Sequence, residues 1–186
     1  MKIVTYALVG AALLSATACK KAPVATPVAG NEASYDNSAA TGPALSPAQQ
    51  FANSAAASDA FEIATSQLAL QKSSSSRVKG FADQMIKAHQ DSTAKLKAAA
   101  ASATPAITPD ATLTAAQSDV LARLKAIEGP AFDAAYIGAQ RDAHEATLAA
   151  LRDYSAHGDI APLKEFATKV TPIVAAHLNM AKGLKG

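Results

Sequence analysis

The sequence predicts an all-α protein whose folded part is a four-helix bundle with a short extra helix in its second connection. Apolar residues recur at helical spacing, and helix start and stop signals divide the chain into segments of suitable length. Hydrophobic residues make up 49% of the 186 residues, aromatic residues only 5%, and there is no Trp. An apolar content dominated by Ala favours helices that pack closely on small side chains.

Capping signals set the expected helix boundaries. Ser46-Pro47-Ala48-Gln49 has an N-cap residue, Pro at the first helical position and Gln three residues after the cap, and Thr114 with Gln117 repeats the capping box. Gly129-Pro130 is expected to close the short helix, and Asp159 to cap the last one. The expected helices cover about 46–72, 77–101, 114–128, 131–156 and 160–184.

Each long helix has one apolar stripe with a polar residue near its middle. The stripes are Phe51, Ala55, Ser58, Glu62, Thr65 and Ala69; Val78, Ala82, Met85, His89 and Leu96; Ile137, Gln140, His144 and Leu151; Leu163, Phe166, Val170, His177 and Leu184. Because the stripes face the interior, we expect Glu62 and at least two of the histidines to meet inside the bundle.

Two interpretations of these polar residues remain open. Glu62, His89, His144 and His177 together offer imidazole and carboxylate ligands, which suit Zn, Cu, Fe or Ni. Alternatively, they are half-buried polar residues that bond to the backbone or to one another. A di-iron site is disfavoured because the residues three before the histidines are Ile86, Arg141 and Val174 instead of Glu. His157, at a helix end, is expected to interact with the helix dipole.

The first eighteen residues have the pattern of a cleavable export signal. Lys2 precedes an apolar run over 3–14, and small residues follow at 16–18. The apolar run is shorter than the roughly 20 residues that span a bilayer. Cys19, the only cysteine, follows directly, and residues 14–19 resemble the bacterial lipobox except that Ala16 stands where Leu is usual. We expect a lipid on Cys19; an ordinary cleavage before an unmodified cysteine is the alternative.

This interpretation divides the chain into a signal (1–18), a lipidated Cys19 with a tether (19–45) and a helical domain (46–186). The tether is rich in Pro, Gly, Ala, Ser and Thr and has too little apolar surface to fold. The resemblance to Gram-negative lipoproteins implies that Lys20, which is not Asp, allows transfer to the outer membrane, where the domain faces the periplasm. The expected partner is therefore the membrane, reached through the lipid.

Several functional classes find no support in the sequence. The net charge of +2 gives no basic footprint for nucleic acid. The chain contains no H-E-x-x-H, no G-x-S-x-G and no Gly-rich phosphate loop. The sequence therefore favours a protein that is not an enzyme.

The folded part resembles the bacterial domain-of-unknown-function family 4142, whose members are exported helical bundles placed near the ferritin-like fold. In this chain Ala88 stands where that family often has Asp before the first histidine. The resemblance implies a ferritin-like fold and an envelope location, and it implies no settled activity. It rests on Phe51 with Glu62, on residues 78–82 with Met85 and His89, on Phe132, Asp133, Tyr136 and His144, and on residues 163–167 with Pro172, His177 and Leu178.

Two functional hypotheses follow. The first is an envelope lipoprotein whose helical bundle binds a partner or a small ligand. The second is a metal-binding or redox-active ferritin-like protein with a transition-metal cofactor held by Glu62, His89, His144 and His177.

If Cys19 carries the lipid, Cys19→Ser should release the mature domain from the membrane fraction or block its processing, because the tether then has no anchor. Fractionation of cells that produce each form measures this directly. Unchanged membrane partitioning of the variant would contradict the lipid anchor.

Overall fold

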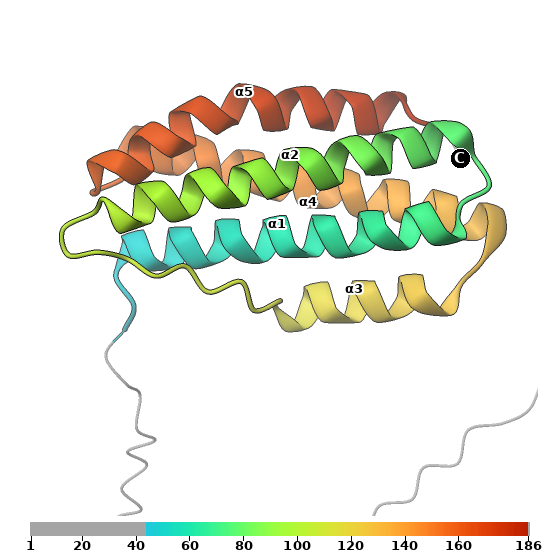
Figure 1. Cartoon of the computed structure of the whole chain (residues 1–186), viewed down its shortest axis with the longest axis horizontal. Helices are drawn as coiled ribbons and strands as arrows, with labels where there is room; N and C mark the ends of the chain where they lie inside the picture. Colours follow the sequence, from blue (N-terminus) through green and yellow to red (C-terminus); the bar gives the residue numbers. More distant parts are fainter. Residues whose placement is uncertain (1–43, 186) are drawn as a thin grey trace, which may run out of the picture. The chain divides into compact units, whose positions relative to one another are not determined.

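The computed structural model describes residues 44–185. The predicted signal, Cys19 and the tether as far as residue 43 lie outside the described residues. The described part contains five α-helices and no strand: α1 (Pro47–Lys72), α2 (Ser76–Ala101), α3 (Ala115–Ala126), α4 (Gly129–His157) and α5 (Ala161–Gly183) (Figure 1). The all-α prediction is confirmed, including the short helix between the second and third long ones.

The predicted capping residues at two helix starts form the expected bonds. The backbone N–H of Gln49 donates to Ser46 Oγ over 3.1 Å, and Pro47 is the first residue of α1. At α3, Thr114 and Gln117 form both bonds of the capping box. These bonds satisfy backbone donors that have no partner within a helix, so the local sequence defines both starts.

Two predicted boundaries are wrong. Gly129 and Pro130 begin α4 instead of closing α3, and Gly129 has a φ of +63°, a conformation that glycine adopts without a steric penalty. Asp159 does not cap α5, because Ile160 occupies the N-cap position and no side chain caps that helix. The Asp159 carboxylate instead accepts a hydrogen bond from the hydroxyl of Tyr154 over 2.9 Å.

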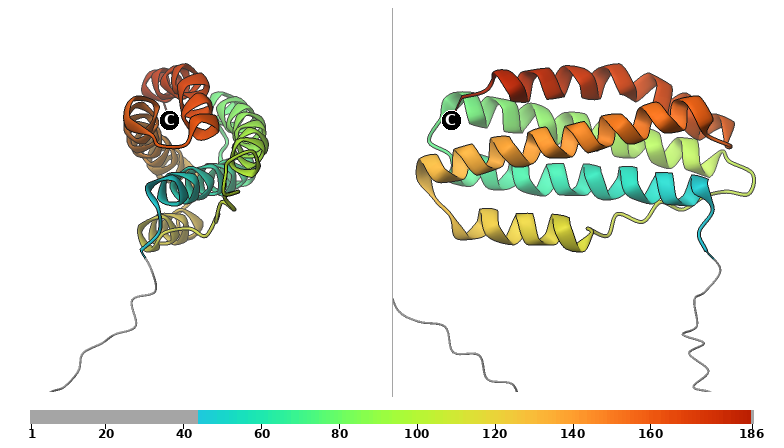
Figure 2. Two further views of the ribbon diagram at one scale, coloured as in Figure 1. Left: turned by 90° about the vertical axis from the view of Figure 1, so that its left-hand side faces the viewer. Right: turned by 180° about the vertical axis from the view of Figure 1, so that it is seen from behind.

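The helices form two neighbouring pairs. Helix α1 packs against α2, and α4 packs against α5, in each case across a short connection. Helix α1 also contacts α4, and α2 contacts α5, so the four long helices enclose a common interior, which is visible end-on in Figure 2. Helix α3 lies outside this group and contacts only α1 and α4 to any extent (Figure 1).

The interior contains two apolar clusters with a polar layer between them. One cluster includes Phe51, Leu96, Leu151, Leu163 and Phe166, and the other includes Val78, Met85, Leu124, Phe132 and Tyr136. Most of the buried polar side chains belong to neither cluster and come from the four long helices. These are Ser58, Asp59, Glu62, Thr65, Ser66, His89, Gln140, His144 and His177.

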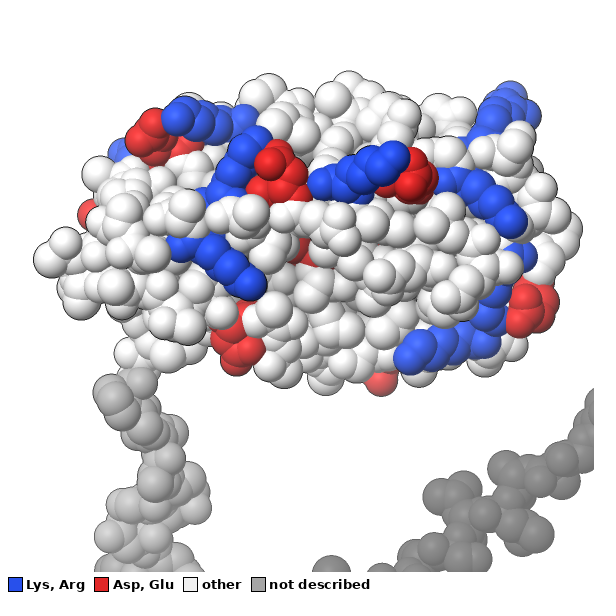
Figure 3. Space-filling model, in the orientation of Figure 1, with Lys and Arg blue, Asp and Glu red and all other residues white. Residues whose placement is uncertain are grey.

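Charged side chains on the face that carries α2 are mixed in sign. Figure 3 shows lysines and arginines beside aspartates and glutamates. On α2, Lys87 pairs with Asp83 and Lys95 with Asp91, each at 2.6 Å between the charged atoms. None of the helices that the structure describes combines the length and hydropathy needed to cross a membrane.

Candidate metal centre

The four residues singled out in the sequence come together in the polar layer. Glu62 lies on α1, His89 on α2, His144 on α4 and His177 on α5. Glu62 and His144 have no exposed surface, His89 is 3% exposed and His177 8%. One ring nitrogen from each histidine lies within 4.8 Å of the corresponding nitrogens of the other two. The three histidines therefore come together, and Glu62 lies close to two of them, His89 and His144.

The Glu62 carboxylate lies between two of the imidazole rings. Its Oε2 atom is 2.7 Å from Nε2 of His89 and 3.2 Å from Nε2 of His144. Its other oxygen, Oε1, accepts a hydrogen bond from Ser58 over 3.2 Å. Ser58 is itself 2.7 Å from the hydroxyl of Thr147 on α4. One oxygen thus faces the histidines while the other is fixed by its own helix.

His89 is oriented by a second carboxylate. Its Nδ1–H donates to Asp59 Oδ1 over 2.8 Å, and the other oxygen of Asp59 accepts from the hydroxyl of Thr93 over 3.1 Å. Asp59 is one helical turn before Glu62, so both side chains are on the same face of α1. This arrangement directs Nε2 of His89 toward Glu62 and the other two histidines.

His144 is oriented by its own helix. Its Nδ1–H donates to the backbone carbonyl of Gln140 over 2.7 Å. A carbonyl can only accept, so Nδ1 carries a hydrogen and Nε2 of a neutral ring has a free lone pair. The side-chain amide of Gln140 is held in turn by Thr65 Oγ1 at 3.0 Å.

The electrostatic environment shifts the pKa values of the ionisable groups at the centre in different directions. Burial disfavours charge on Glu62, but attraction to His89 and His144 and the hydrogen bonds outweigh it, and the pKa of Glu62 is lowered. Burial also opposes charge on His89, yet Glu62 and Asp59 together raise the pKa of His89 to about 10. Burial, with repulsion from the other two histidines, lowers the pKa of His177 to about 4. At pH 7 the metal-free centre thus pairs an imidazolium with a carboxylate and keeps His177 neutral.

Four atoms at the centre are buried without a hydrogen-bond partner among the described residues. They are Oε2 of Glu62, Nε2 of His89, Nε2 of His144 and Nδ1 of His177. Oε2 of Glu62 and Nε2 of His89 nevertheless attract each other as an ion pair at 2.7 Å, so what these two atoms lack is a hydrogen bond of good geometry and not an opposite charge. Buried polar atoms without partners are rare in folded proteins, so the cluster is unusual on physical grounds.

Sequence reasoning missed Asp59. The spacing of three residues between Asp59 and Glu62 could have identified it, because two residues at that spacing share one face of a helix. Attention to the residue before the first histidine was misplaced, since Ala88 is only a neighbour in sequence and the carboxylate that bonds His89 comes from α1. His157 lies apart from the cluster at the end of α4, where it is exposed and 3.0 Å from Asp153.

His144→Ala in the metal-free protein should lower the free energy of unfolding by about 1–3 kcal/mol, because it leaves buried polar groups without a partner. His89→Ala should act in the same direction. His157→Ala is the matched control, and it should change stability little because that ring is exposed. Urea unfolding at pH 7 with a chelator present measures all three, and equal midpoints for the His144 and His157 variants would contradict the buried network.

Comparison with known proteins identifies the family and goes no further. The family model described as a domain of unknown function, DUF4142, matches residues 34–184. No curated protein and no solved structure matches the chain. The family model spans most of the chain and includes all five helices. The chain therefore belongs to the DUF4142 family.

Proposed function

We propose that this domain binds one transition-metal ion through Glu62, His89, His144 and His177. The observation that carries the proposal is the cluster of three buried histidines from three helices beside the buried Glu62 of a fourth, with four buried ligand atoms that lack a hydrogen bond. A polar atom that loses water on folding and gains no partner costs free energy. A metal ion at the centre would bond to all four atoms at once and remove that cost.

The donor set favours a particular class of metal. Three imidazole nitrogens with one carboxylate oxygen suit zinc, copper, iron or nickel, whereas calcium and magnesium prefer oxygen ligands. Ligands bound at about 2.0–2.2 Å to one ion lie up to about 4 Å apart. The ring nitrogens already lie within 4.8 Å of one another, so small side-chain shifts suffice. A single ion fits better than a di-iron pair, which needs several carboxylates.

The surrounding bonds have the arrangement that supports metal ligands. A metal-bound histidine usually donates its second ring N–H to a carboxylate or a backbone carbonyl. His89 donates to Asp59 and His144 to the carbonyl of Gln140, so each ring turns its Nε2 inward. When a metal binds His89, the proton on Nε2 must leave, and Glu62 and Asp59 then balance the charge of the ion.

We also propose that the four long helices form a ferritin-like four-helix bundle and that the protein is an envelope lipoprotein anchored through Cys19. The pairwise packing of the long helices around a common interior supports the bundle. The apolar run before Cys19 and the small residues at 16–18 support export and lipidation. The metal centre then faces the periplasm on a domain tethered to the outer membrane.

The second candidate function is the binding of a small apolar ligand, which requires no metal. A pocket of about 260 Å³ lies between α3, α1 and α4 and is lined by Phe61, Val120 and several alanines. Ligand pockets of this kind are mostly apolar with a few polar groups, and Ser58 and Thr147 supply such groups here.

Protein purified from its native envelope should contain about one equivalent of a transition metal by elemental analysis, because one cluster supplies one set of ligands. His144→Ala should abolish most of this content, and His157→Ala should retain it. A clean metal-free protein that also fails to bind added Zn²⁺, Cu²⁺, Co²⁺ or Ni²⁺ would refute the metal function and favour the second candidate.

Asp59→Asn should weaken metal affinity by roughly 10–100-fold, because it removes the carboxylate that orients His89 without removing a ligand. Asp91→Asn is the matched control: Asp91 is close to His89 in sequence but is exposed and paired with Lys95. Competition with a chelator measures both affinities. Equal affinities for the two variants would show that Asp59 has no role in binding.

A further inference from the structure

The four proposed ligands differ in how firmly they are held. Glu62 accepts from Ser58, His89 donates to Asp59, and His144 donates to a backbone carbonyl. No hydrogen bond or ion pair restrains the His177 ring within residues 44–185, and it is the most exposed of the four. His177 is therefore the ligand that can move at the lowest cost.

The helix that carries His177 also contains a proline. Pro172 lies inside α5, one turn before His177. A proline within a helix has no N–H, so the hydrogen bond to the carbonyl four residues earlier is missing. The carbonyl without this bond belongs to Thr168. The hydroxyl of Thr168 donates to a different carbonyl, that of Lys164.

A small pocket leads from the surface to His177. It lies between α2 and α5, has a volume of about 50 Å³, and is lined by His89 and His177 together with Ala88, Asp91, Ile173 and Val174, among others. A pocket of this size is on the scale of a few water molecules. This pocket reaches two of the proposed ligands.

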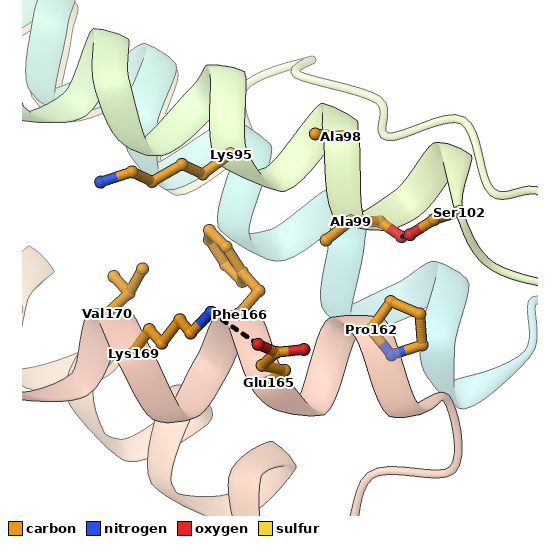
Figure 4. Close-up of a pocket in the computed structure, with 9 residues that line it drawn as sticks. All are labelled: Lys95, Ala98, Ala99, Ser102, Pro162, Glu165, Phe166, Lys169 and Val170. Carbon is orange, nitrogen blue, oxygen red and sulfur yellow. Dashed lines mark hydrogen bonds and ion pairs between the residues drawn. The ribbon is translucent and has the colours of Figure 1, made fainter.

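The pocket continues into a wider groove along the same two helices. Lys95 and Val170 line both, and the groove of about 380 Å³ extends past Phe166 to Ser102 and Pro162. Figure 4 shows its floor of Phe166 and Val170 between the two helices, with Lys169 paired to Glu165 at its side. The groove connects the small pocket to the outside of the domain.

On the opposite side of the centre, the pocket beneath α3 does not reach the proposed ligands. His144 has no exposed surface. The pocket beneath α3 reaches Ser58 and Ala143, but it is lined by none of the four proposed ligands.

We propose that a divalent transition-metal ion enters and leaves the centre through the pocket between α2 and α5, by exchange at His177. This inference rests on the proposed metal function and adds its route and its movable ligand. The incoming ion loses part of its water before it reaches His89, because the pocket is smaller than a fully hydrated ion needs.

The route is tested with Co²⁺, whose release to excess EDTA is followed by visible absorption in a stopped-flow instrument. Ala88→Leu narrows the pocket and should slow release about tenfold, a change of about 1.4 kcal/mol in the barrier. Ile173→Ala widens its mouth and should speed release. Neither should change the equilibrium affinity for Co²⁺, because neither side chain is a ligand.

Ala143→Leu is the matched control for the route. Like Ala88, Ala143 directly precedes a proposed histidine ligand, but it lines the pocket beneath α3. Release from this variant should equal that of the unmodified protein. Slower release from Ala143→Leu with unchanged release from Ala88→Leu would overturn the route, and so would equal rates for all variants.

The exchangeable ligand is tested by chemical rescue. His177→Ala removes a ring beside the pocket, so millimolar imidazole should restore at least part of its Co²⁺ affinity. His144→Ala removes a sealed ring, and imidazole should not restore it. Thermal melts confirm that both variants are folded. Equal rescue of both variants, or rescue of His144→Ala alone, would overturn the assignment of His177.

The two proposals can fail separately. If the unmodified protein binds no Co²⁺, the metal function itself fails. If it binds one equivalent but the pocket variants and the imidazole rescue show no preference for the α2–α5 side, only the route and the role of His177 fail.

Discussion

A fully buried carboxylate determines which side chains can surround it in the interior of the bundle. Glu62 has no exposed surface, and its pKa is lowered, so its charge is retained in the interior. An ion in such a place requires an opposite charge at short range and further hydrogen bonds. His89 supplies the charge, and Ser58 supplies a bond to the oxygen that faces away from the rings. The positions of α2 and α4 relative to α1 follow from this requirement as much as from apolar packing.

The two apolar clusters allow such a polar layer to exist. Each cluster joins residues from all four long helices, one on each side of the layer. They hold the helices at fixed separations and shield Glu62 and His144, which have no exposed surface, and this strengthens the interaction between the two side chains. Fully buried alanines on α1, α2 and α5 let the helices approach closely, so short side chains such as Asp59 reach a neighbouring helix.

Much of the fold and most of the cluster could be predicted from sequence, because both depend on helical periodicity and local capping. Ser46 and Thr114 marked helix starts, and the stripes placed Glu62, His89, His144 and His177 inside. Counting from helix starts gave no assurance that His177 would reach the other three. The number of residues between each side chain and the connection of its helix pair is a better guide. Glu62 and His89 lie at similar distances from the α1–α2 turn, and His144 and His177 lie at similar distances from the α4–α5 turn. Asp59 was missed because its partner, His89, lies on another helix, and Asp159 was misjudged because its carboxylate bonds back to Tyr154 at the end of α4 instead of capping α5.

The pattern of satisfied and unsatisfied atoms distinguishes a ligand-binding centre from a structural polar network. A network that only stabilises a fold is expected to satisfy its members, because each buried atom left unpaired is costly. Here the outward-facing atoms are satisfied: Nδ1 of His89, Nδ1 of His144 and Oε1 of Glu62 all have partners. The inward-facing atoms of the same three residues lack a hydrogen bond, as does Nδ1 of His177; Oε1 of Gln140 and Oδ1 of Asp133, which belong to none of the proposed ligands, also lack one. The outward-facing atoms are thus hydrogen-bonded and the inward-facing atoms are not, which is the arrangement that binding of a shared central ligand requires. Packing of apolar side chains gives no reason for this arrangement.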